Sequence, residues 1–247
     1  MYERCAVIGL GRTTDPRTRV LQRASVIKGF LFDLDGTLVD SERETAEAMA
    51  RALSRHHAIE IEQYDRDFII GRSWLAIYDS LIARYPAITW SRAEMIARTA
   101  ALRDEVIAEL GIRVMPGALD VLRWTRAAHK RALVTGSSRA EVQQVLPHLG
   151  ADATFDVIVA AEDVTRSKPA PDGYQAALAA LGLAPHEVVV VEDSEAGITA
   201  GREAGCRVLA VRAGNFGGWK QDHAHHVVDT LDELTPSLVE LLLRDYG

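Results

Sequence analysis

The sequence predicts an α/β fold in which a parallel sheet is flanked by helices and interrupted by a small α-helical cap domain. Short apolar, β-branched runs alternate with helical patterns along most of the chain, which is typical of a parallel sheet covered on both faces. From residue 41 to residue 113 these runs stop and only helical patterns remain, directly after the first predicted strand. This interruption predicts the inserted domain.

Five apolar runs are the predicted strands: residues 26–32, 131–134, 157–160, 188–191 and 207–211. The fourth run consists of valines without polar alternation, which is the pattern of a strand buried on both faces. The helical patterns between the runs cover residues 119–128, 139–146, 174–181 and 195–204. Because helices separate successive strands, the predicted core is a Rossmann-like sheet.

The helical cap is predicted to comprise residues 41–113, with helical patterns at 42–57, 73–84 and 92–110. The core domain then consists of residues 25–40 and 114–247. This core closes with Thr235-Pro236, an N-cap followed by proline at the first helical position, ahead of an apolar run. Residues 1–24 contain five arginines and lack the apolar segment of a secretory signal, so we expect a flexible N-terminal extension.

The net charge of −7 argues against two classes of partner. An acidic chain lacks the basic surface that binds nucleic acid or an anionic membrane. No apolar run approaches the roughly 18 residues that are needed to cross a bilayer. Cys5 and Cys206 are too few for a disulfide framework, which favours a reducing, cytoplasmic setting. We therefore expect no nucleic-acid or membrane partner, and a monomer or homodimer.

Two aspartates follow the first predicted strand, in the segment Asp33-Leu34-Asp35-Gly36. Residues two apart point the same way in an extended chain, and Gly36 allows a sharp turn directly after them. Two neighbouring carboxylates can share a divalent cation or divide the roles of nucleophile and general acid. Alternatively, both are turn aspartates at a strand-to-loop junction, where Asp-Gly is common.

The segment Thr135-Gly136-Ser137 follows the second predicted strand and leads into a helical pattern. A hydroxyl and free backbone N–H groups at such a junction suit a phosphate oxygen. We predict that these three residues and Gly36 contact a phosphoryl group. The alternative is that they cap the helix that begins near residue 139.

Two further polar clusters follow predicted strands. Lys168 lies in the proline-containing segment 167–171, which holds the chain extended and offers a compact positive charge to an anionic group. Glu192, Asp193 and Ser194 come directly after the all-valine strand, where buried acids are costly unless they are paired or bind a metal. The alternatives are a solvated loop lysine and acids that cap the next helix.

The four clusters resemble, in order and spacing, the four motifs of the haloacid dehalogenase superfamily of phosphotransferases. The resemblance runs from about residue 26 onward. Asp33-Leu34-Asp35-Gly36-Thr37 resembles the first motif, Thr135 the second, Lys168 the third and Glu192-Asp193 the fourth. The helical insertion is similar to the family's small α-helical cap. Segments 167–172 and 191–197 resemble the branch that contains phosphoglycolate phosphatases, other sugar-phosphate phosphatases and β-phosphoglucomutase.

The resemblance implies a Mg²⁺-dependent phosphatase that acts on a small phosphorylated metabolite, such as a sugar phosphate or a phosphoglycolate-like ester. Asp33 would attack phosphorus and form an aspartyl-phosphate, and Asp35 would protonate the leaving oxygen and then deprotonate water. Thr135 and Lys168 would neutralise phosphoryl charge. Mg²⁺ would be held by Asp33, the backbone carbonyl of Asp35 and Asp193, with Glu192 assisting directly or through water.

Other activities of the superfamily that the sequence resembles have weaker support. Haloacid dehalogenases lack the second aspartate, so Asp35 favours phosphate chemistry. The mutase branch has a histidine near the position of Thr45 and a lysine where Ile70 precedes Gly71, and both are absent here. A phosphomutase of the β-phosphoglucomutase type is therefore the alternative, and a non-catalytic phosphate-binding protein is a lower one. The chain has no lysine between Gly29 and His129, which argues against a Schiff-base hydrolase.

Substrate choice is expected to lie in the cap, because the four motifs read only the phosphoryl group. Gly71-Arg72-Ser73-Trp74 begins a predicted cap helix where the resemblance places substrate contacts. Arg72 can bind a carboxylate or a second phosphate, and Trp74 can cover the leaving group. The alternative is that Trp74 belongs to the cap core and Arg72 to the surface.

Overall fold

A computed structural model of the chain describes residues 26–70, 72 and 74–245. The predicted extension, residues 1–24, lies outside them. The strands are β1 (Gly29–Phe32), β2 (Val39–Asp40), β3 (Arg113–Val114), β4 (Lys130–Val134), β5 (Val157–Val159), β6 (Val188–Glu192), β7 (Arg207–Val211) and β8 (His226–Val228). The α-helices are α1 (Glu42–His57), α2 (Gln63–Ile69), α3 (Trp74–Arg84), α4 (Arg92–Leu110), α5 (Ala118–Arg126), α6 (Arg139–Val145), α7 (Asp172–Leu181), α8 (Glu195–Glu203) and α9 (Pro236–Asp245). The 3₁₀ helices cover Leu146–Leu149, Ala161–Asp163, Pro185–Glu187 and Leu231–Glu233.

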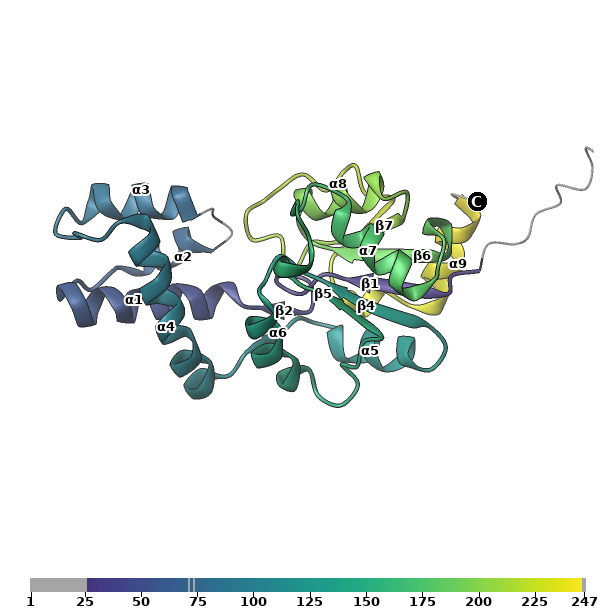
Figure 1. The fold of residues 1–247 in the computed structure, drawn as a ribbon, viewed down its shortest axis with the longest axis horizontal. Helices are drawn as coiled ribbons and strands as arrows, with labels where there is room; N and C mark the ends of the chain where they lie inside the picture. The colour runs from purple at the N-terminus through teal and green to yellow at the C-terminus, as the bar shows by residue number, and fades with distance from the viewer. Residues whose placement is uncertain (1–25, 71, 73, 246–247) are drawn as a thin grey trace, which may run out of the picture.

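Six of the strands form one parallel sheet in the order β5-β4-β1-β6-β7-β8 (Figure 1). Strand β1 lies in the middle, where Gly29 is in register with Lys130 of β4 on one side and Val188 of β6 on the other. Successive connections leave β1 towards β4 and later return to β6, so the strand order reverses beside β1. Open α/β sheets bind ligands at the carboxyl ends of their strands at such a point.

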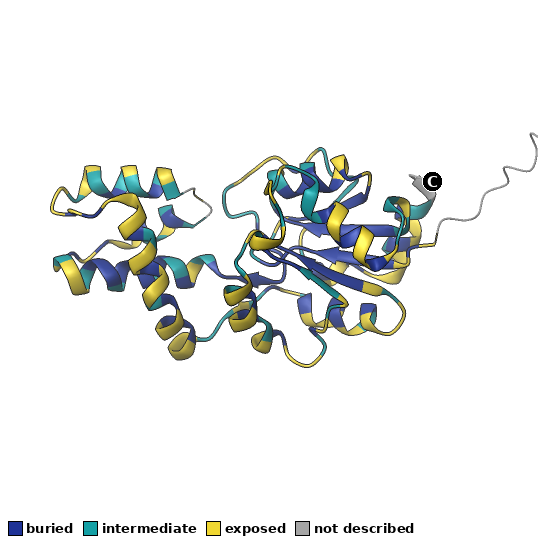
Figure 2. Ribbon diagram, viewed as in Figure 1, coloured by how far each residue is buried: buried dark blue, intermediate teal, exposed yellow. Residues whose placement is uncertain are grey.

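Helices cover both faces of this sheet, and side chains along each strand alternate between two cores. Phe30 and Phe32 pack with residues of α5, α6 and α9, whereas Leu31 packs with residues of α7 and α8. All four valines of β6 are fully buried, as the unbroken valine run predicts. The strands are dark in Figure 2, while the covering helices turn exposed faces outward. The α/β fold predicted from the sequence is confirmed.

Helices α1 to α4 form a separate group at one end of the molecule (Figure 1). They enclose a hydrophobic cluster of their own, in which Met49, Leu53 and Met95 are fully buried. The chain enters this group through β2 and leaves it through β3, and the two short strands pair antiparallel. Two adjacent segments therefore connect the inserted helical group to the core.

Several elements differ from the sequence-based expectation. Strand β1 begins at Gly29, three residues later than predicted, and Val26 is exposed. Helix α2 (Gln63–Ile69) was not predicted, because seven residues show too little periodicity. Strand β8 (His226–Val228) forms one edge of the sheet and was not among the predicted strands. Short edge elements depend on pairing with a neighbour rather than on a local pattern.

In the part of the chain that the structure describes, no helix has the length and apolar character needed to cross a membrane.

Candidate active site

The predicted polar clusters meet at the carboxyl edge of the sheet. Asp33 directly follows β1, Thr135 directly follows β4 and Glu192 ends β6. These three strands are neighbours in the sheet, so residues about 100 and 160 positions apart in sequence come together. The backbone N–H of Asp33 donates to the carbonyl of Val191 at 3.0 Å, which continues the β1–β6 pairing into the site.

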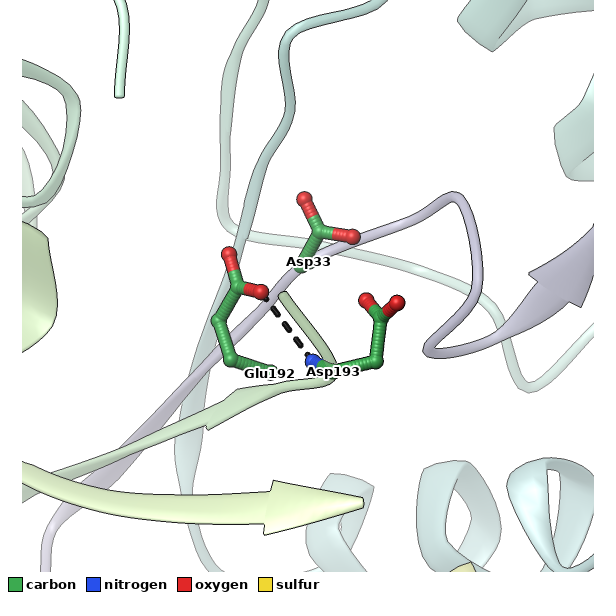
Figure 3. A group of neighbouring side chains, drawn as sticks. All are labelled: Asp33, Glu192 and Asp193. Atoms are coloured by element: carbon green, nitrogen blue, oxygen red, sulfur yellow. Dashed lines mark hydrogen bonds between the residues drawn. The ribbon is translucent and has the colours of Figure 1, made fainter. Parts of the chain in front are cut away.

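Three buried carboxylates converge at this edge. Asp33, Glu192 and Asp193 each offer an oxygen atom, and these atoms lie within 4.8 Å of one another (Figure 3). Lys168 is placed beside them: its Nζ donates to Asp33 Oδ1 at 2.5 Å, to Glu192 Oε1 at 2.6 Å and to the carbonyl of Val134 at 2.9 Å. The lysine is therefore a fixed part of the cluster and not a solvated loop residue.

Glu192 is fully buried, and both of its carboxylate oxygens are hydrogen-bonded. Oε1 accepts from Lys168 and from the Tyr174 hydroxyl at 2.9 Å. Oε2 accepts from the N–H groups of Asp193 and Ser194, both at 3.1 Å, and from the Ser194 hydroxyl at 3.0 Å. A Cβ at Gly197 would lie 1.7 Å from Oε1, so only glycine leaves room for this carboxylate.

Asp193 is fixed from the opposite side by the turn after β1. The Thr37 hydroxyl donates to Asp193 Oδ1 at 3.0 Å. Gly36 has a φ of 85°, and a Cβ there would lie 2.4 Å from Asp193 Oδ2. The backbone N–H of Gly36 donates to the carbonyl of Val39 at 2.7 Å. With its N–H bonded in this way, Gly36 is a turn and packing residue, and its contact with a phosphoryl group stays a prediction.

The cluster carries more negative than positive charge, and burial makes this imbalance costly. Desolvation, opposed by Lys168, raises the pKa of Asp33 to about 8. Desolvation and the neighbouring Glu192 raise the pKa of Asp193 well above its usual range. Although burial lowers it, the pKa of Lys168 is raised by the two carboxylates that it contacts. A set of buried oxygen ligands with excess negative charge fits a hard divalent cation such as Mg²⁺.

Mg²⁺ is expected to stabilise the protein more at high pH than at low pH. Because the folded-state pKa of Asp33 lies above its unfolded value, stability without metal falls as pH rises from about 4 to about 8. Metal binding needs the ionised ligand, so saturating Mg²⁺ should raise Tm by about 5 °C or more near pH 8 and by less near pH 5.5. Thermal unfolding measures this. An equal shift at both pH values, or an unchanged shift in Asp193→Asn, would contradict it.

The second aspartate occupies a different environment. Asp35 Oδ2 accepts from the Ser137 hydroxyl at 2.5 Å and from the Thr135 hydroxyl at 3.4 Å, and Ser41 donates to Oδ1. Its carboxylate is not part of the three-carboxylate cluster found among the described residues. Ser138, not Thr135, caps helix α6 by accepting from the Glu141 N–H at 3.3 Å. Asp33 thus belongs to the three-carboxylate cluster, whereas Asp35 is held by hydroxyl groups.

A cavity of about 330 Å³ lies between this second aspartate and the helical cap. Arg72 and Trp74 line it, and Trp74 also packs against the cap core. Their contact with a substrate stays a prediction. Gly71 and Ser73 lie outside the described residues. The other lining residues are Asp35, Ser41, Glu42, Thr45, Ile69, Ile77, Ile96, Thr99, Ala100, Arg103, Ser137 and Glu141.

Three site residues were not found from the sequence. Ser41 holds Asp35, Tyr174 holds Glu192, and Arg103 of the cap pairs with Glu141 of the core at 2.7 Å. Tyr174 lies on the buried face of a helical pattern that starts next to the Lys168 segment, which is the one signal that could have drawn attention to it. Arg103 carries no local signal, because its partner Glu141 lies 38 residues away in sequence. Ser41 lies six residues from Asp35, but it belongs to none of the recognised motifs.

Tyr174→Phe is expected to weaken Mg²⁺ binding about 10-fold, because it removes one of the donors that orient Glu192. Loss of this buried hydrogen bond should cost about 1 kcal/mol of unfolding free energy. Tyr78→Phe is the matched control, since the Tyr78 hydroxyl makes a bond of the same length to Trp90 inside the cap. Isothermal titration with Mg²⁺ compares the two variants. Equal affinities would show that Tyr174 only packs.

Comparisons with known proteins agree with this geometry. A family model described as haloacid dehalogenase-like hydrolase matches residues 27–205. The chain is 39% identical over 191 residues to hexitol phosphatase A of Escherichia coli, covering 75% of this chain and 83% of that protein. It is 34% identical over 176 residues to validoxylamine A 7'-phosphate phosphatase of Streptomyces hygroscopicus subsp. limoneus, covering 71% and 81%.

A solved structure has a similar fold. CbbY from Rhodobacter sphaeroides, in complex with phosphate, matches with a TM-score of 0.65 at 26% identity and covers 85% of this chain and 96% of that one. The family model spans well over half of the chain, and the two relatives are phosphatases. The chain therefore belongs to the haloacid dehalogenase-like hydrolases and is a phosphoric monoester hydrolase.

Proposed function

We propose that the protein is a Mg²⁺-dependent phosphatase of small phosphorylated polyols or sugars that works through an aspartyl-phosphate on Asp33. The observation that carries the proposal is the division between the two aspartates. Asp33 lies among buried carboxylates and contacts Lys168, whereas Asp35 faces the cavity and is held by hydroxyl groups. Pairs of acids in different environments are suited to different roles.

In the first step, a carboxylate oxygen of Asp33 forms a bond to phosphorus. The bond between phosphorus and the leaving oxygen breaks, and Asp35 gives its proton to that oxygen. The hydroxyls of Ser41 and Ser137 hold the Asp35 carboxyl at the edge of the cavity, where a leaving group would lie. The products of this step are the released alcohol and phosphorylated Asp33.

In the second step, Asp35 takes a proton from water, and the water oxygen forms a bond to phosphorus. The bond from phosphorus to Asp33 breaks, which restores the carboxylate and releases inorganic phosphate. Lys168, which contacts Asp33, and Thr135, which contacts Asp35, would compensate the negative charge of the phosphoryl oxygens. Asp33, Glu192 and Asp193 would hold Mg²⁺, which supplies additional positive charge at the phosphoryl group.

The charges around the cavity favour a leaving group without a second anionic group. Its lining contains three carboxylates, of Asp35, Glu42 and Glu141, and two guanidinium groups, of Arg72 and Arg103. The Arg103 group is already paired with Glu141. The hydroxyls of a polyol can donate to the carboxylates of this lining and accept from its guanidinium groups. A carboxylate on the leaving group would instead be repelled by the net negative charge of the lining. The name of the relative hexitol phosphatase A supports this choice.

A panel of phosphate esters tests the proposal. Hexitol and hexose phosphates are expected to be hydrolysed with Mg²⁺ and with higher kcat/KM than phosphoglycolate, and EDTA should abolish phosphate release. A preference for phosphoglycolate would overturn the proposed substrate class. Isomerisation of a hexose 1-phosphate without net phosphate release would instead establish a mutase.

A cytoplasmic location is part of the proposal, because two cysteines are too few for a disulfide framework and the buried Cys206 forms no disulfide among the described residues.

A further inference from the structure

The loop after β7 carries Gln221, whose side chain reaches the backbone of Asp193. Gln221 is buried, and its Nε2 donates to the carbonyl of Asp193 at 2.6 Å and to the carbonyl of Val211 at 2.9 Å. A side-chain amide nitrogen carries two hydrogens, so it can serve both bonds. Because both acceptors are carbonyl oxygens, only the nitrogen end of the amide can face them.

The two carbonyls belong to the ends of neighbouring strands. The last pairing of β6 with β7 joins Glu192 to Ala210, so Asp193, just past β6, and Val211, the last residue of β7, come next along the chain. Gln221 connects these two strand ends one position beyond the backbone pairing. Gln221 therefore extends the link between β6 and β7 at the point where the chain leaves β6 and reaches Asp193 of the three-carboxylate cluster.

Asp193 depends on side chains for its position, because it lies one residue past β6. Its N–H donates to Glu192 Oε2 at 3.1 Å, its carboxylate accepts from Thr37, and its carbonyl accepts from Gln221. Glu192 and Thr37 belong to two of the recognised motifs. Gln221 is the contribution of a loop 28 residues away in sequence.

The same loop is fitted closely to the turn after β1. A Cβ at Gly214 would lie 1.6 Å from the carbonyl oxygen of Gly36, so the loop backbone packs directly on that turn. Gly36 in turn packs against the Asp193 carboxylate. The loop thus contacts both segments that carry acidic residues of the cluster.

We propose that Gln221 is a positioning residue for the divalent cation, acting through Asp193. By holding the Asp193 peptide between the two strand ends, it keeps the carboxylate within reach of those of Asp33 and Glu192. This inference rests on the proposed function, which places a cation at that cluster. Groups that orient metal ligands typically contribute 10- to 100-fold to metal affinity, so Gln221→Leu should weaken Mg²⁺ binding by about that factor.

The test is isothermal titration of the full chain with Mg²⁺ alone, followed by the Mg²⁺ dependence of kcat. Gln221→Leu keeps a similar volume but removes both bonds, and its kcat at saturating Mg²⁺ should stay within about 3-fold of the unsubstituted protein. Asn215→Ala is the matched control. Asn215 makes two side-chain bonds of 2.7 Å to the backbone of Trp219 in the same loop, and its Mg²⁺ affinity should be unchanged.

Unchanged Mg²⁺ affinity in Gln221→Leu would overturn the inference, as would an equal loss in Asn215→Ala. If the leucine variant does not fold, Gln221→Asn decides, because it keeps an amide that is too short to reach both carbonyls. Weaker binding in that variant supports the inference, and unchanged binding rejects it. Failure of the unsubstituted protein to bind Mg²⁺ is a distinct result that would overturn the proposed cation site itself.

Discussion

Asp33→Asn is expected to lower kcat by about 10⁴-fold or more, because the amide cannot form the phosphoryl-enzyme bond. The fold should survive the change. The asparagine carbonyl can still accept from Lys168, and the substitution removes a carboxylate whose ionised form is opposed by burial. Steady-state kinetics and thermal unfolding measured on the same preparation check both parts.

The direction in which Asp33→Asn changes the unfolding temperature shows whether lost activity comes from lost structure. Near pH 8 and without Mg²⁺, Asp33→Asn should unfold at the same temperature as the unsubstituted protein or at a higher one, since the pKa of Asp33 is raised to about 8 by burial. Lost activity is then not explained by lost structure. Retention of more than about one hundredth of the activity would remove Asp33 from the nucleophile's role.

Asp35→Asn is expected to lower kcat by about 10²- to 10⁴-fold with an alkyl phosphate, because the leaving oxygen is no longer protonated. The environment of Asp35 should tolerate the amide. The hydroxyls of Ser41 and Ser137 can rotate to donate to its oxygen or accept from its nitrogen. The loss should therefore appear in kinetics and not in Tm.

The two roles of Asp35 can be separated with para-nitrophenyl phosphate, whose leaving group needs little protonation. Asp35→Asn should transfer the phosphoryl group quickly and then stall, because no base activates water. Rapid mixing should show a burst of about one nitrophenolate for each active site. Ser137→Ala is a useful comparison, since it removes one hydroxyl from Asp35 and leaves the acid in place. A slow, burst-free reaction in Asp35→Asn would contradict the assignment.

The sequence was informative where local pattern and chemistry coincide. The valine run before Glu192 predicts a buried strand, and the acids at its end are costly there without partners. The structure supplies Lys168, Tyr174 and Ser194 as those partners. The N-cap alternative for this cluster is also realised, but by Ser194, whose hydroxyl accepts from the Gly197 N–H at 3.0 Å. The buried acid with partners is Glu192, and the helix N-cap is Ser194, two residues further along the chain.

Residues that act through tertiary contacts could not be found in this way. Gln221 lies in a loop without a periodic pattern, and only the β6–β7 register brings its amide to Asp193. Arg103 lies among the charged residues of α4, and its partner Glu141 becomes its neighbour only when the cap meets the core. Sequence spacing predicts which residues share an element, whereas these contacts depend on how elements pack.

The most direct test of the central claim is to find the phosphoryl group on Asp33. Asp35→Asn is mixed with para-nitrophenyl phosphate and Mg²⁺, quenched in acid during the burst, digested and analysed by mass spectrometry. We predict one phosphoryl group on the peptide that contains Asp33, and none when Asp33→Asn is combined with Asp35→Asn. A burst without this modification, or a phosphoryl group on another residue, would contradict Asp33 as the nucleophile.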